Sequence, residues 1–266
     1  MVLKENGKFI HAVSEGLGDP VILLHGIAAS LFDWNRLIPD LAGCGYRALA
    51  LDLPGHGESF KPSQPEAYRM ETLYGHLERW IVEQAGVAPV ALVGHSMGGY
   101  LSLLYTLRHP DRVRGLVLIN PLYSPQQLRP LLQAGRRHPR VGEKALRLTP
   151  EWLMNILMGW DPSKPADFPP DARRQIANDY KRASPHIVYI TQTIPDLTPL
   201  LAQVATPTLL IWGEKDHTLQ PASFHRLAQL IPGAASSAIP GCGHQPHIGQ
   251  PTLVNRLTLD FLASLK

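Results

Sequence analysis

The chain alternates between short apolar runs and segments whose apolar residues recur at helical spacing. Mostly apolar runs, which are typical of strands covered on both faces, lie at residues 21–24, 48–51, 89–93, 113–119 and 208–212. Amphipathic helices are expected between or after them, at residues 72–84, 224–230 and 253–265. Strands and helices in this alternation predict an α/β fold, with a mostly parallel, doubly covered sheet and right-handed crossovers.

Three weaker segments extend this pattern. Residues 9–13 alternate weakly and end near two glycines, which predicts an antiparallel strand at the edge of the sheet. Ser30 can cap a helix over residues 31–41, where apolar residues recur at helical spacing. Residues 234–239 predict one more strand before the last helix.

The regular alternation stops after Asn120 and does not resume until the strand expected at 208–212. Prolines divide the intervening chain into short helical patterns, including those at 151–160 and 171–183. An insertion at this point would lie over the edge of the sheet and act as a cap. We therefore predict an α/β core formed by residues 1–120 and 205–266, with a helical cap insertion at residues 121–204.

The apolar run at 89–93 leads directly into Gly94-His95-Ser96-Met97-Gly98, and a helical pattern follows. Glycines on both sides of Ser96 let strand and helix approach closely and permit a strained backbone that turns the Oγ atom outward. The start of the helix adds free N–H groups and a positive dipole end beside that oxygen. A glycine-rich turn without chemical use is the competing interpretation, but the position between strand and helix favours a nucleophile elbow.

A serine hydroxyl is a weak nucleophile at neutral pH, so it needs a base and a third group that orients the base. An acid, Asp216, follows one expected strand after Ser96, and a histidine, His244, follows the next. The carboxyl ends of parallel strands meet at one edge of the sheet. We therefore expect these three side chains to lie together, in the chain order Ser, Asp, His.

Composition and charge disfavour several other classes of protein. Hydrophobic residues make up 44% and charged residues 18% of the chain, as in ordinary soluble proteins, and no apolar run is long enough to span a membrane. The first residues lack the apolar centre of a leader peptide, and Cys44 and Cys242 suggest no disulfide framework, so a cytoplasmic location is expected. The net charge of +3, with one basic cluster at 136–140 and no interleaved aromatics, disfavours nucleic-acid binding.

The elbow, the acid and the base, together with a His25-Gly26 turn after the first buried strand, occur in the order found in one family. The chain resembles α/β-hydrolase-fold serine hydrolases with a helical cap, over nearly its full length apart from the cap. The resemblance implies that Ser96 is the nucleophile, that His244 is the general base, and that Asp216 orients and stabilises the imidazole.

The same resemblance implies an oxyanion hole built from the backbone N–H groups of Ile27 and Met97. One position departs from the family. Relatives often carry a glutamate a few residues after the catalytic histidine, where this chain has Gly249.

Other residues compete for these roles. Some family members place the acid after the preceding strand, but Asn120 stands there and orients a cationic ring poorly; Glu214 is a minor rival of Asp216. His247 is a rival of His244, while a structural hydrogen bond is expected for His95. A metal pair of His244 and His247 lacks a carboxylate or a third histidine at usable spacing, so no metal is expected. Asp52 and His56 lie in a loop rich in glycine and proline, which favours a structural role.

Candidate substrate contacts come from His25 and from aromatic residues of the cap, Trp152, Trp160 and Tyr189. Trp152, Ile156 and Trp160 recur at helical spacing, which is more typical of packing than of a cavity lining. Both interpretations remain open for Tyr180 and Tyr189 as well.

A serine at the elbow narrows the chemistry within the family, because haloalkane dehalogenases and epoxide hydrolases of this fold use aspartate there. Acyl transfer without a cofactor remains, and we expect hydrolysis of small to medium hydrophobic carboxylic esters. Carbon–carbon bond hydrolases of ring-fission products, lactonases, thioesterases, acyltransferases and perhydrolases use the same triad, and a receptor for a small molecule is a further alternative. The expected partner is a small-molecule substrate; the sequence does not predict an oligomeric state.

Overall fold

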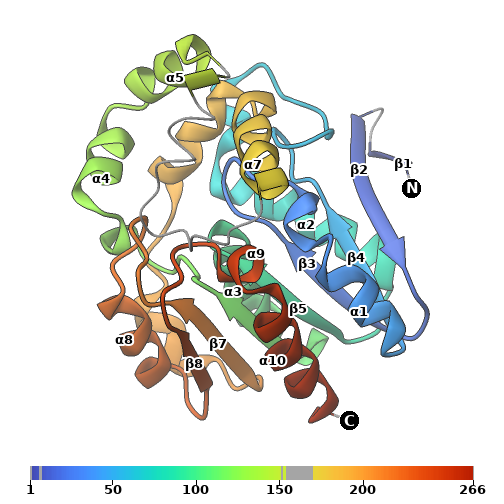
Figure 1. Cartoon of the computed structure of the whole chain (residues 1–266). Helices are drawn as coiled ribbons and strands as arrows, with labels where there is room; N and C mark the ends of the chain where they lie inside the picture. The colour runs from blue at the N-terminus through green and yellow to red at the C-terminus, as the bar shows by residue number, and fades with distance from the viewer. Residues whose placement is uncertain (1, 6–7, 151, 154–169, 266) are drawn as a thin grey trace.

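Figure 1 shows the computed structural model of the chain, which describes residues 2–5, 8–150, 152–153 and 170–265. Within this part of the chain, eight strands form one sheet in the order β1-β2-β4-β3-β5-β6-β7-β8. The first two strands pair antiparallel, β2 also runs antiparallel to β4, and the other neighbours are parallel. The strands are β1 (Val2–Glu5), β2 (Lys8–Glu15), β3 (Asp19–Leu24), β4 (Tyr46–Leu51), β5 (Val90–His95), β6 (Val113–Ile119), β7 (Thr208–Gly213) and β8 (Ala235–Ile239).

The connections between the strands are mostly helical. The α-helices are α1 (Leu37–Gly43), α2 (Met70–Ala85), α3 (Met97–Arg108), α4 (Pro130–Arg137), α5 (Pro139–Leu148), α7 (Pro170–Arg182), α8 (Ala222–Leu230), α9 (Pro246–Gly249) and α10 (Pro251–Ala263). Short 3₁₀-helices are η1 (Leu31–Trp34), η2 (Pro65–Tyr68), η3 (Pro110–Arg112), η4 (Pro125–Gln127), η5 (Pro185–Thr193) and η6 (Thr198–Gln203).

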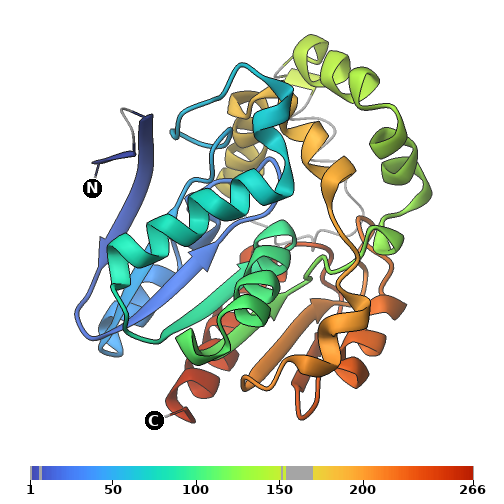
Figure 2. The same ribbon diagram turned by 180° about the vertical axis from the view of Figure 1, so that it is seen from behind.

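Helices cover both faces of the sheet, as the continuous apolar strands require. Helices α1 and α10 lie on the face toward the viewer in Figure 1, and α2 and α3 lie on the face seen in Figure 2. Alternate strand residues divide between the two cores: Leu23 and Val93 pack with α1 and α10, whereas Ile22 and Leu92 pack with α2, α3 and α8. The α/β fold with a mostly parallel, doubly covered sheet is therefore confirmed.

The chain between β6 and β7 leaves the sheet, and its helices α4, α5 and α7 lie above the carboxyl ends of the strands in Figure 1. Its 3₁₀-helix η5 contributes Ile187 and Ile190 to the same apolar core as α2 and α3. The division into a core of residues 1–120 and 205–266 and a cap of residues 121–204 stays a prediction. No described helix combines the length and the apolar character that crossing a lipid bilayer requires.

Two sequence predictions about local structure are wrong. β2 is not the edge strand, because β1 pairs along its outer side with Val2 opposite His11. The segment 31–41 is not one helix. Ser30 caps only the 3₁₀-helix η1, by accepting a hydrogen bond from the backbone N–H of Phe32, and α1 begins separately at Leu37.

Candidate active site

Ser96 lies between β5 and α3, at the point where the strand stops and the helix starts. Its backbone has φ 52° and ψ −113°, a left-handed conformation that side chains rarely adopt and that sharp turns at functional sites often contain. The turn is possible because Gly94 and Gly98 stand two residues before and two residues after Ser96. A Cβ atom at Gly98 would collide with the backbone carbonyl of Leu24, so the helix reaches the strand only without a side chain there.

Three side chains that are far apart in the sequence form one hydrogen-bonded chain at this turn. His244 Nε2 lies 3.0 Å from Ser96 Oγ, and His244 Nδ1 lies 2.7 Å from Asp216 Oδ2. A carboxylate only accepts hydrogen bonds, so Nδ1 donates to Asp216 and Nε2 is left to accept the hydroxyl proton of Ser96. The structure therefore brings together Ser96, His244 and Asp216, as the sequence predicts.

Asp216 is fully buried and has four hydrogen-bond donors. Besides His244, its carboxylate accepts bonds from Asn120 Nδ2 at 2.7 Å and from the backbone N–H groups of Thr218 and Leu219 at 2.7 and 2.9 Å. Burial alone would raise the pKa of Asp216, but the charge of His244 and these hydrogen bonds outweigh it and lower the pKa to about 2. The group is therefore a fixed anion beneath the imidazole.

Asn120 has a second contact that joins two strands. Its side-chain Oδ1 atom accepts a hydrogen bond from the backbone N–H of Gly213 at 3.1 Å. The backbone N–H of Asn120 donates to the carbonyl of Ile211 at 2.9 Å. One amide side chain thus ties the end of β6 to the end of β7 and also holds Asp216. Asn120 is therefore a hydrogen-bond partner of Asp216, and it is Asp216 that contacts His244.

The two expected oxyanion donors lie on either side of Ser96. The N–H of Met97 belongs to the first residue of α3, and Ile27 lines the cavity in front of Ser96, next to Ala28, which has φ 58°. Within the described residues neither N–H has a backbone acceptor. Both N–H groups are therefore available as donors, and their role as an oxyanion hole stays a prediction.

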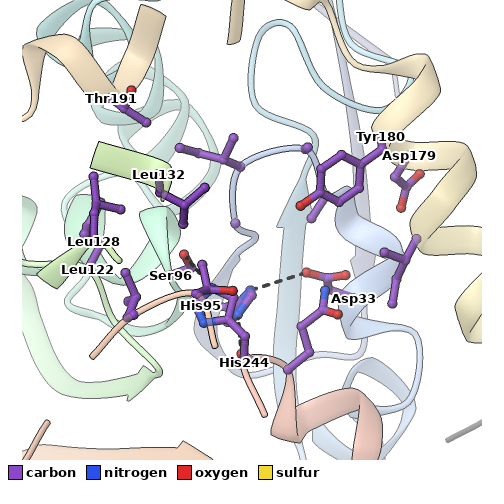
Figure 3. Close-up of a pocket in the computed structure, with 18 residues that line it drawn as sticks. Asp33, His95, Ser96, Leu122, Leu128, Leu132, Asp179, Tyr180, Thr191 and His244 are labelled. Atoms are coloured by element: carbon purple, nitrogen blue, oxygen red, sulfur yellow. Dashed lines mark hydrogen bonds and ion pairs between the residues drawn. The ribbon is translucent and has the colours of Figure 1, made fainter. Parts of the chain in front are cut away.

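A cavity of about 250 Å³ opens above Ser96 and His244. Figure 3 shows that its two sides differ: Leu122, Leu128 and Leu132 line one side, while Asp33, Asp179 and Tyr180 lie on the other. Among the described lining residues there is no lysine or arginine. The cavity thus offers an apolar wall and two carboxyl groups, but no described cation, to a bound molecule.

Asp179 lies on the inner side of α7 and was not foreseen. Its carboxyl accepts hydrogen bonds from Ser30 Oγ and Gln175 Nε2, both at 2.9 Å. Burial, with further contributions from the charges of Asp33 and Asp52, raises the pKa of Asp179 to about 7. Asp179 follows Ala172 and Ile176 at helical spacing, so it lies on the apolar face of the helix. A carboxylate at such a position is the feature of the sequence that could have identified it.

Among the candidate substrate contacts that the structure describes, His25, Trp152 and Tyr189 do not line this cavity. His25 is buried with both ring nitrogens on backbone groups, since Nδ1 donates to the carbonyl of Gly26 and Nε2 accepts from the N–H of Leu53. Trp152 is 64% exposed, and Tyr189 donates its hydroxyl to Glu143. Trp160 lies outside the described residues.

The rival residues have other partners. Glu214 is exposed, whereas His247 is buried beside Asp33 and His95. His95 donates from Nε2 to the backbone carbonyl of His244, at 2.9 Å.

The loop residue Asp52 binds His11 and the backbone N–H groups of Leu31 and Glu58, at 2.7 to 2.9 Å. These contacts support the structural role expected for the loop that contains Asp52.

Comparisons with known proteins agree with this architecture. The 2-hydroxy-6-oxononadienedioate/2-hydroxy-6-oxononatrienedioate hydrolase of Escherichia coli (strain K12) is 29% identical over 280 residues, which cover 98% of this chain and 94% of that protein. A thermophilic esterase from Thermogutta terrifontis has a TM-score of 0.85 at 24% identity, with 100% of this chain and 98% of that chain covered. The enol-lactonase from Burkholderia xenovorans LB400 has a TM-score of 0.83 at 23% identity, with 99% and 100% covered.

At such identities the two structures support the fold alone, and the family rests on a match to a family sequence model. The sequence model described as alpha/beta hydrolase fold matches residues 19–251, which include the elbow, the acid and the base. The chain belongs to the α/β-hydrolase fold family.

Proposed function

We propose that the protein hydrolyses neutral carboxylic esters of small to medium size through an acyl-enzyme on Ser96. The observation that carries this proposal is the hydrogen-bonded chain from Ser96 through His244 to Asp216, at 3.0 and 2.7 Å, beneath a partly apolar cavity. Serine, base and buried anion in this order are what a nucleophilic hydroxyl needs at neutral pH.

In the first half of the reaction, Ser96 Oγ attacks the ester carbonyl carbon while its proton moves to His244 Nε2. The carbonyl oxygen becomes an oxyanion, which the N–H groups of Ile27 and Met97 stabilise. The imidazolium is stabilised by Asp216, whose pKa of about 2 keeps it charged. His244 then donates its proton to the leaving alcohol oxygen, the carbon–oxygen bond breaks, and the acyl group remains on Ser96.

In the second half, water takes the place of the alcohol. His244 accepts a proton from water as its oxygen attacks the acyl carbon, and the same two N–H groups hold the second oxyanion. The bond to Ser96 Oγ breaks as His244 returns the proton to that oxygen. The products are a carboxylic acid and an alcohol, and the enzyme is regenerated.

The cavity lining supports a neutral substrate. The leucines on one side can bury an alkyl or aryl group, at about 25 cal/mol for each Å² of apolar surface removed from water. In the protein without a bound ion, Asp33 and the ionised fraction of Asp179, whose pKa is about 7, repel a carboxylate, and the described lining residues include no lysine or arginine. Residues 121–204, as the proposed cap, supply both Asp179 and most of the leucines.

Carbon–carbon bond hydrolysis is the second candidate, because the Escherichia coli relative at 29% identity carries the name of a dienedioate hydrolase. A dienedioate bears two carboxylates, which the described acidic wall disfavours. A lactonase, thioesterase, acyltransferase or small-molecule receptor would share the site but differ in turnover.

The test compares p-nitrophenyl butyrate with a vinylogous diketone that carries carboxylates, using the wild type and Ser96→Ala. We expect rapid ester turnover that Ser96→Ala abolishes, together with stoichiometric labelling of Ser96 by a fluorophosphonate. Faster turnover of the diketone than of the ester would favour the carbon–carbon reaction. Labelling without turnover of either substrate would favour a receptor, and absence of labelling in folded protein would refute the nucleophile.

A further inference from the structure

A second group of polar side chains lies buried behind the catalytic histidine. It consists of Asp33 in η1, His95 at the end of β5 and His247 in α9, with exposed fractions of 5%, 2% and 4%. Asp33 Oδ2 lies 3.7 Å from His95 Nδ1 and 3.6 Å from His247 Nε2. Each of the three residues offers one ligand atom, and these atoms lie within 4.8 Å of one another. Figure 3 shows Asp33 directed toward His95.

These atoms have no hydrogen-bond partners among the described residues. Asp33 Oδ2, His95 Nδ1 and His247 Nε2 are all buried and unpartnered, and separations of 3.6 and 3.7 Å are too long for hydrogen bonds between them. Native proteins rarely leave even one buried polar atom in this state, because its desolvation is not offset. Three such atoms that converge on one point form an arrangement that a bound charge would satisfy.

The tautomer of His95 determines the sign of that charge. Its Nε2 atom lies 2.9 Å from the backbone carbonyl of His244, which only accepts, so Nε2 carries the hydrogen. In a neutral ring with its hydrogen on Nε2, Nδ1 presents a lone pair. That lone pair faces Asp33.

A lone pair that faces a carboxylate oxygen is repulsive unless a donor or a cation lies between them. A proton on His247 would neutralise one pair of the group and leave the His95–Asp33 pair unchanged. A cation bound to all three atoms satisfies the whole group. Two imidazole nitrogens and one carboxylate oxygen are ligands that Zn²⁺ and related ions prefer.

We propose that Asp33, His95 and His247 form a binding site for a divalent transition-metal ion of the zinc type. With bonds of about 2.0–2.1 Å, neighbouring ligands of a tetrahedral ion lie about 3.3 Å apart. The two separations from Asp33 Oδ2 exceed this by a few tenths of an ångström, and the two histidine nitrogens, within 4.8 Å of each other, approach further when the ion binds. The bond from His95 Nε2–H to a carbonyl is the usual way in which a metal-binding histidine is oriented. His247 is held in place by stacking on Trp34, with ring centroids 5.0 Å apart.

The site is reachable from the substrate cavity and is connected to the catalytic base. Asp33 and His95 both line that cavity, which gives an ion a route to the buried ligands. The carbonyl that His95 holds is that of His244, so the ion fixes the backbone of the residue that serves as the base. The ion is thus a positioning group and does not contact the reacting ester.

The test uses the full chain, stripped with a chelator and titrated with Zn²⁺ by calorimetry, with Co²⁺ absorption as a report of ligand geometry. We expect one Zn²⁺ per chain, a rise in melting temperature on binding, and intense visible Co²⁺ bands typical of four-coordination. Asp33→Asn and His247→Gln should each weaken binding by about 100-fold or more. His138→Ala, at an exposed histidine of the same chain, is the matched control and should bind normally.

A further variant, His244→Gln, tests whether Zn²⁺ binds to the catalytic histidine instead. We expect it to keep the full equivalent of Zn²⁺. Loss of binding in His244→Gln alone would assign the ion to the catalytic triad and overturn the proposal. Absence of stoichiometric binding by the wild type, or equal binding by Asp33→Asn and His247→Gln in folded form, would overturn it as well. None of these outcomes depends on ester hydrolysis, so the proposed function is tested separately.

Discussion

Asp179→Asn should make the protein more stable at alkaline pH while leaving its stability at acid pH nearly unchanged. The substitution removes the charge and keeps the contacts: an asparagine can accept from Gln175 and donate to Ser30, the two present partners of Asp179. The expected effect therefore isolates the cost of ionising a carboxyl that folding buries.

The magnitude follows from the pKa. Burial raises the pKa of Asp179 from 3.8 to about 7, and the ordinary value returns on unfolding. The native state therefore binds a proton that the unfolded state has lost between these values, so stability falls as pH rises through this window and stays low above it. At about 1.4 kcal/mol for each pKa unit, the upper limit is about 4 kcal/mol. Because the carboxyl lines a cavity that water can enter, we expect about 2 kcal/mol.

The assay is urea unfolding, followed by circular dichroism at several values between about pH 5 and about pH 8. The free energy of unfolding of Asp179→Asn should exceed that of the wild type by about 2 kcal/mol at the alkaline end and by less than about 1 kcal/mol at the acid end. Asp171→Asn, at an exposed position of the same helix, is the matched control and should follow the wild type across the range. Parallel curves for Asp179→Asn and the wild type would refute the reasoning.

The remaining predictions concern the catalytic acid, the elbow and the cavity wall. Asp216→Asn should reduce kcat about 10⁴-fold with KM nearly unchanged, because an amide cannot hold the imidazole in the required tautomer; steady-state kinetics would measure this. Gly98→Ala should destabilise the fold by about 3 kcal/mol, because its Cβ meets the Leu24 carbonyl, whereas Gly135→Ala, which has open space in α4, should stabilise it by up to about 1 kcal/mol; urea unfolding compares them. Leu128→Ala, which enlarges the cavity on its apolar side, should shift the preference among p-nitrophenyl esters toward longer acyl chains. It should also lower the free energy of unfolding by about 2 kcal/mol.

Each of these has an outcome that contradicts it. An undiminished kcat in Asp216→Asn would move the acid role to another residue. Equal unfolding free energies for Gly98→Ala and Gly135→Ala would show that the helix does not need the close approach. An unaltered acyl-chain profile in Leu128→Ala would place the acyl group elsewhere.

The sequence predicts the sheet and the hydrogen-bonded chain well, because both depend on local patterns. The strand at 113–119 is predicted with its bounds, and Ser96, Asp216 and His244 are found from their position after strands. In a parallel sheet the end of each strand has a fixed place, so separation along the chain does not matter.

The parts that the sequence does not predict depend on contacts between distant segments. β1 is a short run without clear alternation, and only its pairing with β2 makes it a strand. Asp179 and Asp33 reach the cavity because α7 and η1 are packed against it, which no spacing within either segment specifies. The group of Asp33, His95 and His247 likewise unites three elements, whereas the sequence offered only the pair His244 and His247.

The side chain of Asn120 makes the sheet itself part of the catalytic geometry. Ser96 follows β5 and Asp216 follows β7, with β6 between them, so a slip of one residue between β6 and β7 would displace Asp216 by about 3.3 Å relative to Ser96. The amide contacts both Gly213 and the carboxylate, and it therefore penalises any such slip at the place where it would matter most. Substitutions deep in the sheet, far from any substrate, can consequently slow the reaction by altering strand alignment while leaving every reacting group intact.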